Sequence, residues 1–256
     1  IAAELSSWCQ QRQLPLQVDQ AAPGQVPSEA KARHWRYERL DQRGRQAGAD
    51  VVTGHTASDR AETMLLQLAR GSDLAGLAAL PSVRPLSPEG PLLRRPLLHL
   101  QRHDTLQICR DLALPIWEDP SNQSPEFARN RIRQEVLPVL EALHPGSTQR
   151  MSDLAERVSQ VRDSQTELSR MALKLLQTAA GLDRRGLGAL SSASRRLLLA
   201  QWLQQQGVPA LPASQLDELS RRLEGGAPGG AADLAGGWQL SWKGAELVLQ
   251  QRAAER

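Results

Sequence analysis

The sequence predicts an α/β fold in its first half, followed by a mainly helical domain with a small β-hairpin. Helix and strand patterns alternate over residues 1 to about 100, which favours a parallel sheet with helices on its faces. From Met151 onward, apolar residues recur at spacings of three and four, which is typical of a long helix with heptad character. His144-Pro145-Gly146 separates the two patterns, so we expect domains at residues 1–145 and 146–256.

Composition limits the class of function. The 256 residues include 31 Lys and Arg against 28 Asp and Glu, and this net charge of +3 is compatible with a nucleic-acid partner without requiring one. Cys9 and Cys109 lie far apart, so a disulfide framework and a CxxC metal or redox pair are both excluded. Because no run of about eighteen apolar residues occurs, we expect a cytoplasmic protein with no membrane function.

The beginning of the chain predicts an incomplete strand–helix–strand unit. A helical pattern already starts at Ile1, which is not methionine, and a strand pattern follows at residues 14–18. We therefore expect the first strand, and the natural start of the protein, to be absent. Next we expect a helix that Ser28 caps, that runs through Leu40 and whose end Gly44 and Gly48 mark, and then a strand at residues 49–53 buried on both faces.

The helix after that strand places a carboxylate at its N-terminus. Its apolar residues are spaced at i, i+3, i+4 and i+7, Asp59 and Glu62 fit a capping box, and Gly71 fits the C-terminal stop. In open parallel sheets, ligands bind where strands end and helices begin. A histidine such as His55 can bind phosphate or transfer a proton there, and Asp59 can hold magnesium or steer an amine. The commoner roles are a surface histidine and a simple helix cap.

Further along, the pattern predicts loop or edge structure at residues 80–96, a helix at 104–113 and an extended segment at 114–117. The helix around Ile132 should be kinked by Pro138. In the second half we expect shorter helices at 195–206 and 214–223, a flexible glycine-rich connection at 225–237, and a hairpin of residues 238–242 and 246–249.

Two groups of arginines are candidates for binding RNA. Arg129, Arg131 and Arg133 begin a helix, and at 100° per residue Arg129 and Arg133 fall on one side of its apolar stripe and Arg131 on the other. Arginine grips phosphate through a fixed fork, but a solvated charged face that pairs with neighbouring acidic residues is equally compatible. The second group lies at residues 31–45 with Trp35 and Tyr37 interleaved, where either base stacking or core packing explains the aromatics.

Six blocks in this order resemble the tRNA(Ile)-lysidine synthases of the PP-loop ATP pyrophosphatase superfamily. They cover roughly residues 28 to 145: Ser28–Arg33 with Arg36, Tyr37 and Leu40; Gly54–Thr63; Arg70-Gly71 with Gly76-Leu77; Arg95–Leu98; Trp117–Asn122; and Arg129–Arg133. The resemblance implies a partial Rossmann-like PP-loop domain, like that of the adenine nucleotide alpha hydrolases, before a helical tRNA-binding domain.

The resemblance also implies the reaction and its partners. Such enzymes use ATP and Mg²⁺ to adenylate the wobble cytidine of the isoleucine tRNA with a CAU anticodon, and the amine of free lysine then displaces AMP. His55 and Asp59 would be catalytic, Asp59 would also be a magnesium ligand, and His55 and Ser58 would bind the nucleotide. The residues expected to bind tRNA or the activated intermediate are Arg33, Arg36, Arg95, Asp119, Asn122, Arg129, Asn130, Arg131 and Arg133. A homodimer is compatible with the pattern.

Two departures from the family pattern matter. Where the family shows His-His-x-Asp-Asp, this chain has His55-Thr56-Ala57-Ser58-Asp59. The SGGxDS loop that wraps the ATP phosphates is absent and would lie upstream of Ile1, so we expect the 256-residue chain by itself to be nearly inactive. The alternatives are a tRNA-binding module without catalysis and a PP-loop tRNA thiolase, which the lack of a CxxC pair disfavours.

Overall fold

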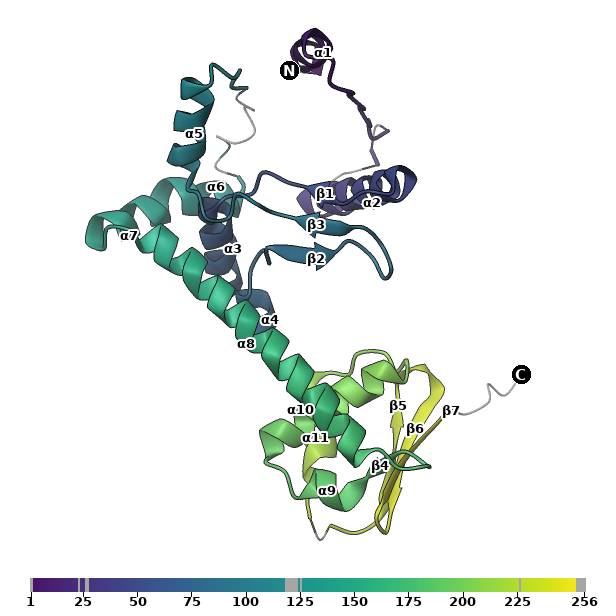
Figure 1. Cartoon of the computed structure of the whole chain (residues 1–256). Coiled ribbons are helices and arrows are strands. Elements are labelled where there is room, and N and C mark those ends of the chain that lie inside the picture. Colours follow the sequence, from purple (N-terminus) through teal and green to yellow (C-terminus); the bar gives the residue numbers. More distant parts are fainter. Residues whose placement is uncertain are drawn as a thin grey trace. The chain divides into compact units, whose positions relative to one another are not determined.

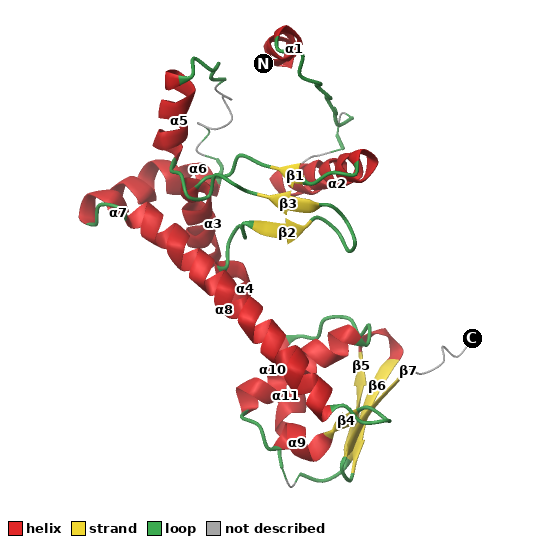
Figure 2. Ribbon diagram, in the orientation of Figure 1, coloured by secondary structure: helices red, strands yellow, loops and turns green. Residues whose placement is uncertain are grey.

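The computed structural model describes residues 2–22, 24–25, 28–117, 124, 126–225 and 227–251, and it divides into two compact units, Ile1–Arg162 and Asp163–Arg256 (Figure 1). Figure 2 shows that the helices and strands of each unit form their own layers. None of the helices described is long and apolar enough to cross a membrane.

The first unit contains a small sheet whose strand order is β1-β3-β2. β1 (Val51–Val52) pairs parallel with β3 (Leu92–Arg94), and β2 (Val83–Pro85) pairs antiparallel with β3. The α/β character is confirmed, but the expectation of a strand buried on both faces at 49–53 is wrong: Val52 is 62% exposed, so the described residues leave one face of β1 open. Residues 14–18 are likewise not a strand in the structure.

The helices of this unit are α1 (Ala2–Gln11), α2 (Glu29–Ala47), α3 (Ala57–Ala69), α4 (Leu74–Leu77), α5 (Arg102–Asp111), α6 (Ala128–Arg131) and α7 (Leu137–Leu143). Ser28 caps α2 as expected, and the helix passes through Leu40 to Ala47 and ends at Gly48, the second of the two glycines expected there, which adopts the left-handed conformation.

The start of α3 differs from the expected capping box of Asp59 and Glu62. Thr56 is the N-cap, and its side chain accepts a hydrogen bond from the backbone N–H of Asp59. The Asp59 carboxylate in turn accepts one from the N–H of Thr56. The helix therefore begins three residues earlier, because a threonine hydroxyl can cap as a carboxylate does. This shift places Asp59 and Glu62 on successive turns of one face.

A widened, π-helical turn precedes Pro138, in the helix that was expected to be kinked there. The segment Ile132–Val136 is π-helical and joins α6 to α7, whose second residue is Pro138. Proline has no N–H to donate to the preceding turn, and the wider π-helical turn accommodates the chain where that hydrogen bond is missing.

α8 (Ser147–Leu176) begins one residue after the domain boundary expected from the sequence, yet the compact units divide later, between Arg162 and Asp163. The reason is that the first turns of α8 belong to the core of the first unit, where Ala155 packs with Met64 and Ala79.

The second unit surrounds one apolar core with helices and an antiparallel sheet of order β4-β7-β6-β5. Its elements are β4 (Leu182–Asp183), α9 (Arg184–Gly188), α10 (Ser192–Gln205), α11 (Ala213–Arg222), β5 (Gly230–Leu234), the 3-10 turn Ala235–Gly237, β6 (Trp238–Lys243) and β7 (Glu246–Gln251). The expected hairpin is confirmed as β6 and β7. The expected flexible connection at 225–237 is wrong in part, because its second half is strand β5 paired with β6.

Candidate active site

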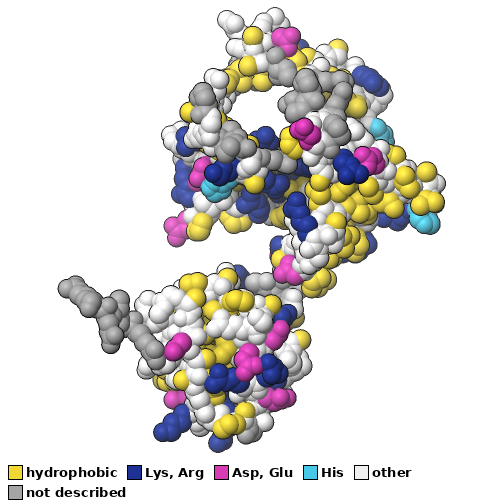
Figure 3. All heavy atoms as spheres, turned by 180° about the vertical axis from the view of Figure 1, so that it is seen from behind, with side chains coloured by type: hydrophobic (Ala, Val, Ile, Leu, Met, Phe, Trp, Pro, Cys, Tyr) yellow, Lys and Arg dark blue, Asp and Glu magenta, His cyan; other side chains and the backbone are white. Residues whose placement is uncertain are grey.

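A cavity of about 380 Å³ lies in the first unit, where β1 ends and α3 begins. Its walls come from α2, from the segment after β1, and from the first turns of α3 and α5; the lining residues are Arg36, Tyr37, Leu40, Thr53, Gly54, His55, Asp59 and Arg102. The structure thus brings together three of the residues expected from the sequence, His55, Asp59 and Arg36. Figure 3 shows a group of dark-blue Lys and Arg side chains on this unit.

His55 is held as a neutral imidazole. Its Nδ1 lies 2.9 Å from Oγ1 of Thr53, which fixes the ring. Burial, above all, lowers the pKa of His55 to about 4; Arg95, Arg129 and Arg33 add to this, while Asp59 acts against it. At neutral pH the side chain therefore offers a hydrogen bond without a charge.

The two oxygens of Asp59 have different partners. Oδ2 accepts hydrogen bonds from the backbone N–H and from Oγ1 of Thr56, both at 2.8 Å. Oδ1 accepts from Nη2 of Arg102 and of Arg129, both at 3.1 Å. Burial alone would raise the pKa of Asp59, but these hydrogen bonds and charges outweigh it and hold the pKa below its ordinary value. Asp59 is thus both a helix cap and the anionic side of a charged site.

Glu62 is the centre of this network, although the sequence suggested only a capping role for it. It is fully buried, and its carboxylate accepts hydrogen bonds from Nε of Arg129 and from Nε of Arg133, each at 2.7 Å. Nη2 of Arg133 adds a further bond at 3.0 Å. Together with Asp59 and Arg102, three guanidinium groups face two carboxylates, so the network keeps a net positive charge beside the cavity.

The arginine-rich segment divides as its periodicity predicts. Arg129 and Arg133 turn inward to the network, whereas Arg131 is exposed and pairs with Glu135 one turn along the helix at 2.9 Å. Asn130 is buried, and its amide donates to the backbone oxygen of Ser124 at 2.8 Å. This environment suits Asn130 to hold its own segment in place, in contrast to the RNA contact expected from the sequence.

A second cationic cluster surrounds Tyr37 at the edge of the cavity. The guanidinium carbons of Arg33 and Arg84 lie 5.5 and 4.9 Å from the centre of its ring. Burial would raise the pKa of Tyr37, but its hydrogen bond with Arg95 and the nearby guanidinium charges lower it. Arg33 and Arg95 were expected here. Arg84 was missed, because only the pairing of β2 with β3 brings it near α2.

The remaining expected site residues have other surroundings. Oγ of Ser58 accepts the backbone N–H of Arg102, the first residue of α5, at 3.2 Å, so Ser58 connects two helix starts at the cavity. Asp119 and Asn122 lie outside the residues that the structure describes.

The side chains do not fit a magnesium ion that the protein alone would hold. Among the described residues no group of three or more His, Cys, Asp or Glu could hold a metal, and both oxygens of Asp59 already accept bonds from the protein. Magnesium typically binds through one or two carboxylates together with substrate phosphates. The site therefore offers a positively charged environment, and no set of ligands for a metal ion is found among the described residues.

Comparisons with known proteins agree with this arrangement. A PP-loop domain model matches residues 2–140, and a model described as the TilS substrate binding domain matches residues 182–253. A tRNA(Ile)-lysidine synthase of Parasynechococcus marenigrum is 66% identical over 99% of this chain and 76% of that protein. One of Prochlorococcus marinus is 40% identical over 97% of this chain and 76% of that protein, and one of Salinispora arenicola is 38% identical over 86% and 67%.

Among solved structures, a U34-tRNA thiolase from Methanococcus maripaludis is similar over 60% of this chain and 54% of that chain, with a TM-score of 0.49 and 17% identity. This similarity is too distant to bear on function. The family models and the curated relatives, in contrast, agree over almost the whole sequence. The chain belongs to the tRNA(Ile)-lysidine synthase family.

Proposed function

We propose that this protein ligates free lysine to the wobble cytidine of isoleucine tRNA with a CAU anticodon and so forms lysidine. The O2 oxygen of the cytidine attacks the α-phosphorus of ATP, and pyrophosphate leaves. The lysine side-chain amine then attacks C2 of the adenylated base, loses a proton, and displaces AMP. The observation that supports this proposal most directly is the meeting of neutral His55, anionic Asp59 and the arginine network at the end of a parallel strand.

The residues of the cavity suit this chemistry in separate ways. The net positive network of Arg102, Arg129 and Arg133 stabilises negative charge as the phosphate bond breaks. Among the described residues that line the cavity, the Asp59 carboxylate offers the only negative charge, and it would orient the lysine amine. His55 would act as a neutral hydrogen-bonding group at the nucleotide. Magnesium, where it takes part, would arrive with the triphosphate.

The direct test uses the enzyme expressed from its complete gene with ATP, lysine and a transcript of the tRNA. Nucleoside digestion and mass spectrometry should show cytidine converted to lysidine, with AMP released in equal amount. A transcript with uridine at the wobble position is the control and should stay unmodified. If no lysine enters the tRNA while ATP is present in excess, the proposed function is wrong.

The pH dependence of the reaction should not contain a titration of His55. Because its pKa is about 4 in the folded protein, the imidazole is uncharged throughout pH 6–8. We expect His55→Gln to lower kcat about 10- to 100-fold, as loss of one transition-state hydrogen bond does, without changing the shape of the pH profile over that interval. An inflection near pH 6.5 that is present in the wild type and lost in His55→Gln would contradict this role.

The same pKa shift affects stability at acid pH. Because the pKa of His55 is lower in the folded than in the unfolded protein, the fold favours the neutral imidazole. The contribution of His55 to stability is therefore complete above about pH 6.5 and is lost as the pH falls towards 4. His55→Gln should lose less stability than the wild type over that interval.

Arg131 is the arginine of its segment that is best placed to meet tRNA phosphate from solution, since its side chain is 62% exposed. We expect Arg131→Ala to weaken tRNA binding and to reduce the slope of log Kd against log salt by about 1, with little change in the stability of the fold. Glu135→Gln is the reciprocal control, because it frees Arg131 and removes a negative charge. It should leave binding unchanged or tighter. An unchanged salt slope in Arg131→Ala would argue against a phosphate contact.

A further inference from the structure

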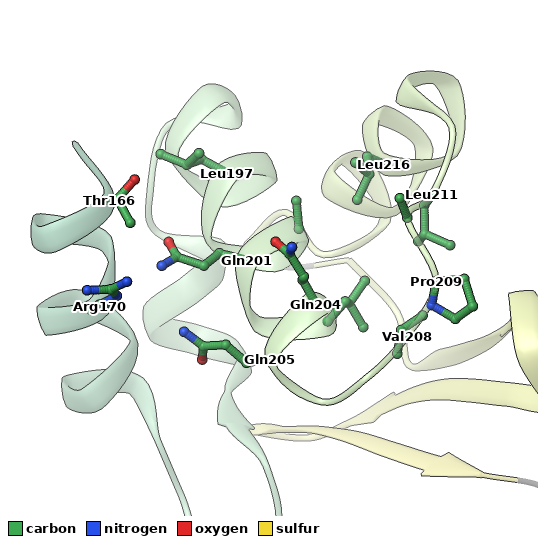
Figure 4. Close-up of a pocket in the computed structure, with 13 residues that line it drawn as sticks. Thr166, Arg170, Leu197, Gln201, Gln204, Gln205, Val208, Pro209, Leu211 and Leu216 are labelled. Atoms are coloured by element: carbon green, nitrogen blue, oxygen red, sulfur yellow. The ribbon is translucent and has the colours of Figure 1, made fainter. Parts of the chain in front are cut away.

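The second unit contains a cavity of about 790 Å³, more than twice the volume of the one at α3, and nothing in the chemistry above uses it (Figure 4). It lies between the last turns of α8, one face of α10, the segment after α10, and α11. This volume is in the range of pockets that enclose small organic ligands.

The walls of the cavity divide into an apolar and a polar part. Leu197, Val208, Pro209, Leu211 and Leu216 form the apolar part. Gln201, Gln204 and Gln205 follow Leu197 at helical spacing on α10, and Arg170 faces them from α8. The opposite face of α10 fills the core with Leu199, Trp202 and their neighbours. α10 is thus buried on one face and presents carboxamides on another.

These carboxamides have no partner within the described part of the protein: no hydrogen bond joins the side chains of Gln201, Gln204 or Gln205, or of Arg170, to another residue there. A carboxamide both donates and accepts, as the Watson–Crick edges of nucleobases do. The apolar side chains suit the face of a base, and Arg170 suits the phosphate beside it.

The charge of the lining distinguishes between possible occupants. None of the thirteen described residues that line the cavity is acidic, so among them a free lysine would find no partner for either of its ammonium groups. A polyanion such as RNA, in contrast, would meet no negative charge on these residues and could pair with the guanidinium group of Arg170.

We propose that this cavity binds one unstacked nucleobase of the tRNA, with the glutamine amides on its Watson–Crick edge and Arg170 at the adjoining phosphate. This inference rests on the proposed function, because it takes tRNA as the substrate, and it adds a recognition site in the second unit. Single-stranded loops of RNA are read in this manner, by bases that leave the stack and enter a pocket.

The test compares the double variant Gln201→Met/Gln205→Met with Gln206→Met in the full-length enzyme. Methionine keeps the length and helix propensity of glutamine but removes the amide, and exposed Gln206 follows the same helix outside the cavity. The tRNA complex is probed with dimethyl sulfate and a carbodiimide, which modify unprotected Watson–Crick edges. We expect one unpaired base to be protected by the wild type and by Gln206→Met, and to become reactive with the double variant. Affinity should fall roughly three- to tenfold.

A second arm tests the phosphate contact. Arg170→Gln should reduce the slope of log Kd against log salt by about 0.7 to 0.9. An identical footprint in wild type and double variant overturns the proposal. So does a lowered Tm with an unchanged footprint, which would mean that a segment of protein fills the cavity. Lysidine formation is measured in parallel: a wild type that makes lysidine with a footprint independent of the glutamines refutes only this inference, whereas a wild type that makes none refutes the proposed function.

Discussion

Replacing Glu62 by glutamine should destabilise the protein by about 3 kcal/mol and reduce lysidine formation at least 100-fold. The carboxylate is fully buried and forms close ion pairs with Arg129 and Arg133, whose side chains are only 23% and 22% exposed. Removal of one partner from a buried ion pair leaves an uncompensated charge, which costs more than the pair itself contributes. Activity should fall as well, because the two guanidinium groups would no longer be held in place beside Asp59.

Glu135→Gln is the matched control. Glu135 also pairs with an arginine of the same segment, at 2.9 Å, but its side chain is 52% exposed and that of Arg131 is 62% exposed. Ion pairs between exposed side chains contribute little to stability, so this variant should unfold like the wild type. Urea unfolding of both variants measures the difference, and kcat is compared well below the unfolding midpoint. Equal losses of stability in both variants would show that the burial of the network has no energetic consequence.

The expectations that succeeded at this site came from local signals. His55 and Asp59 were placed correctly between a strand end and a helix start, because that placement depends on contacts close in sequence, although the N-cap is Thr56 and not Asp59. The division of Arg129 and Arg133 from Arg131 follows from helix geometry alone.

The partners that the sequence did not reveal lie far along the chain. Arg102 reaches Asp59 across 43 residues, and Arg133 reaches Glu62 across 71. No periodicity encodes such a pairing, because it depends on how α3, α5 and α6 pack. A carboxylate at i+3 from Asp59 was the one local clue to Glu62, and capping explained it equally well.

Short strands were misjudged for a related reason. β5 lies in a stretch that its glycines made look flexible, yet Gly230 is required by packing: a Cβ there would lie 2.9 Å from the ring of Trp242. Glycine in a strand can mark such a close approach, and the ring that requires it is identified only when β5 and β6 are paired.

Replacing Asp59 by asparagine should separate catalysis from binding. An amide can still cap the helix with its oxygen, but it cannot form ion pairs with Arg102 and Arg129, which are each 3.1 Å from Oδ1. We expect kcat for lysidine formation to fall at least 100-fold, tRNA affinity to stay within about twofold, and unfolding free energy to drop by about 1 to 2 kcal/mol. Single-turnover kinetics and tRNA binding measure the first two, and urea unfolding measures the third.

Asp104→Asn shows whether capping alone explains such a result. Asp104 occupies the same third position of a capping box, on α5, and accepts the backbone N–H of Gln101 at 2.7 Å. Its other oxygen lies 3.0 Å from Nε2 of His103, whereas the corresponding oxygen of Asp59 contacts two arginines. Asp104 is also not among the residues that line the cavity. Asp104→Asn should therefore lose a comparable capping contribution and keep its activity within about twofold. If both variants lose activity in proportion to stability, Asp59 is a helix cap only; if Asp59→Asn alone loses it, the ion pairs at the cavity are what the reaction requires.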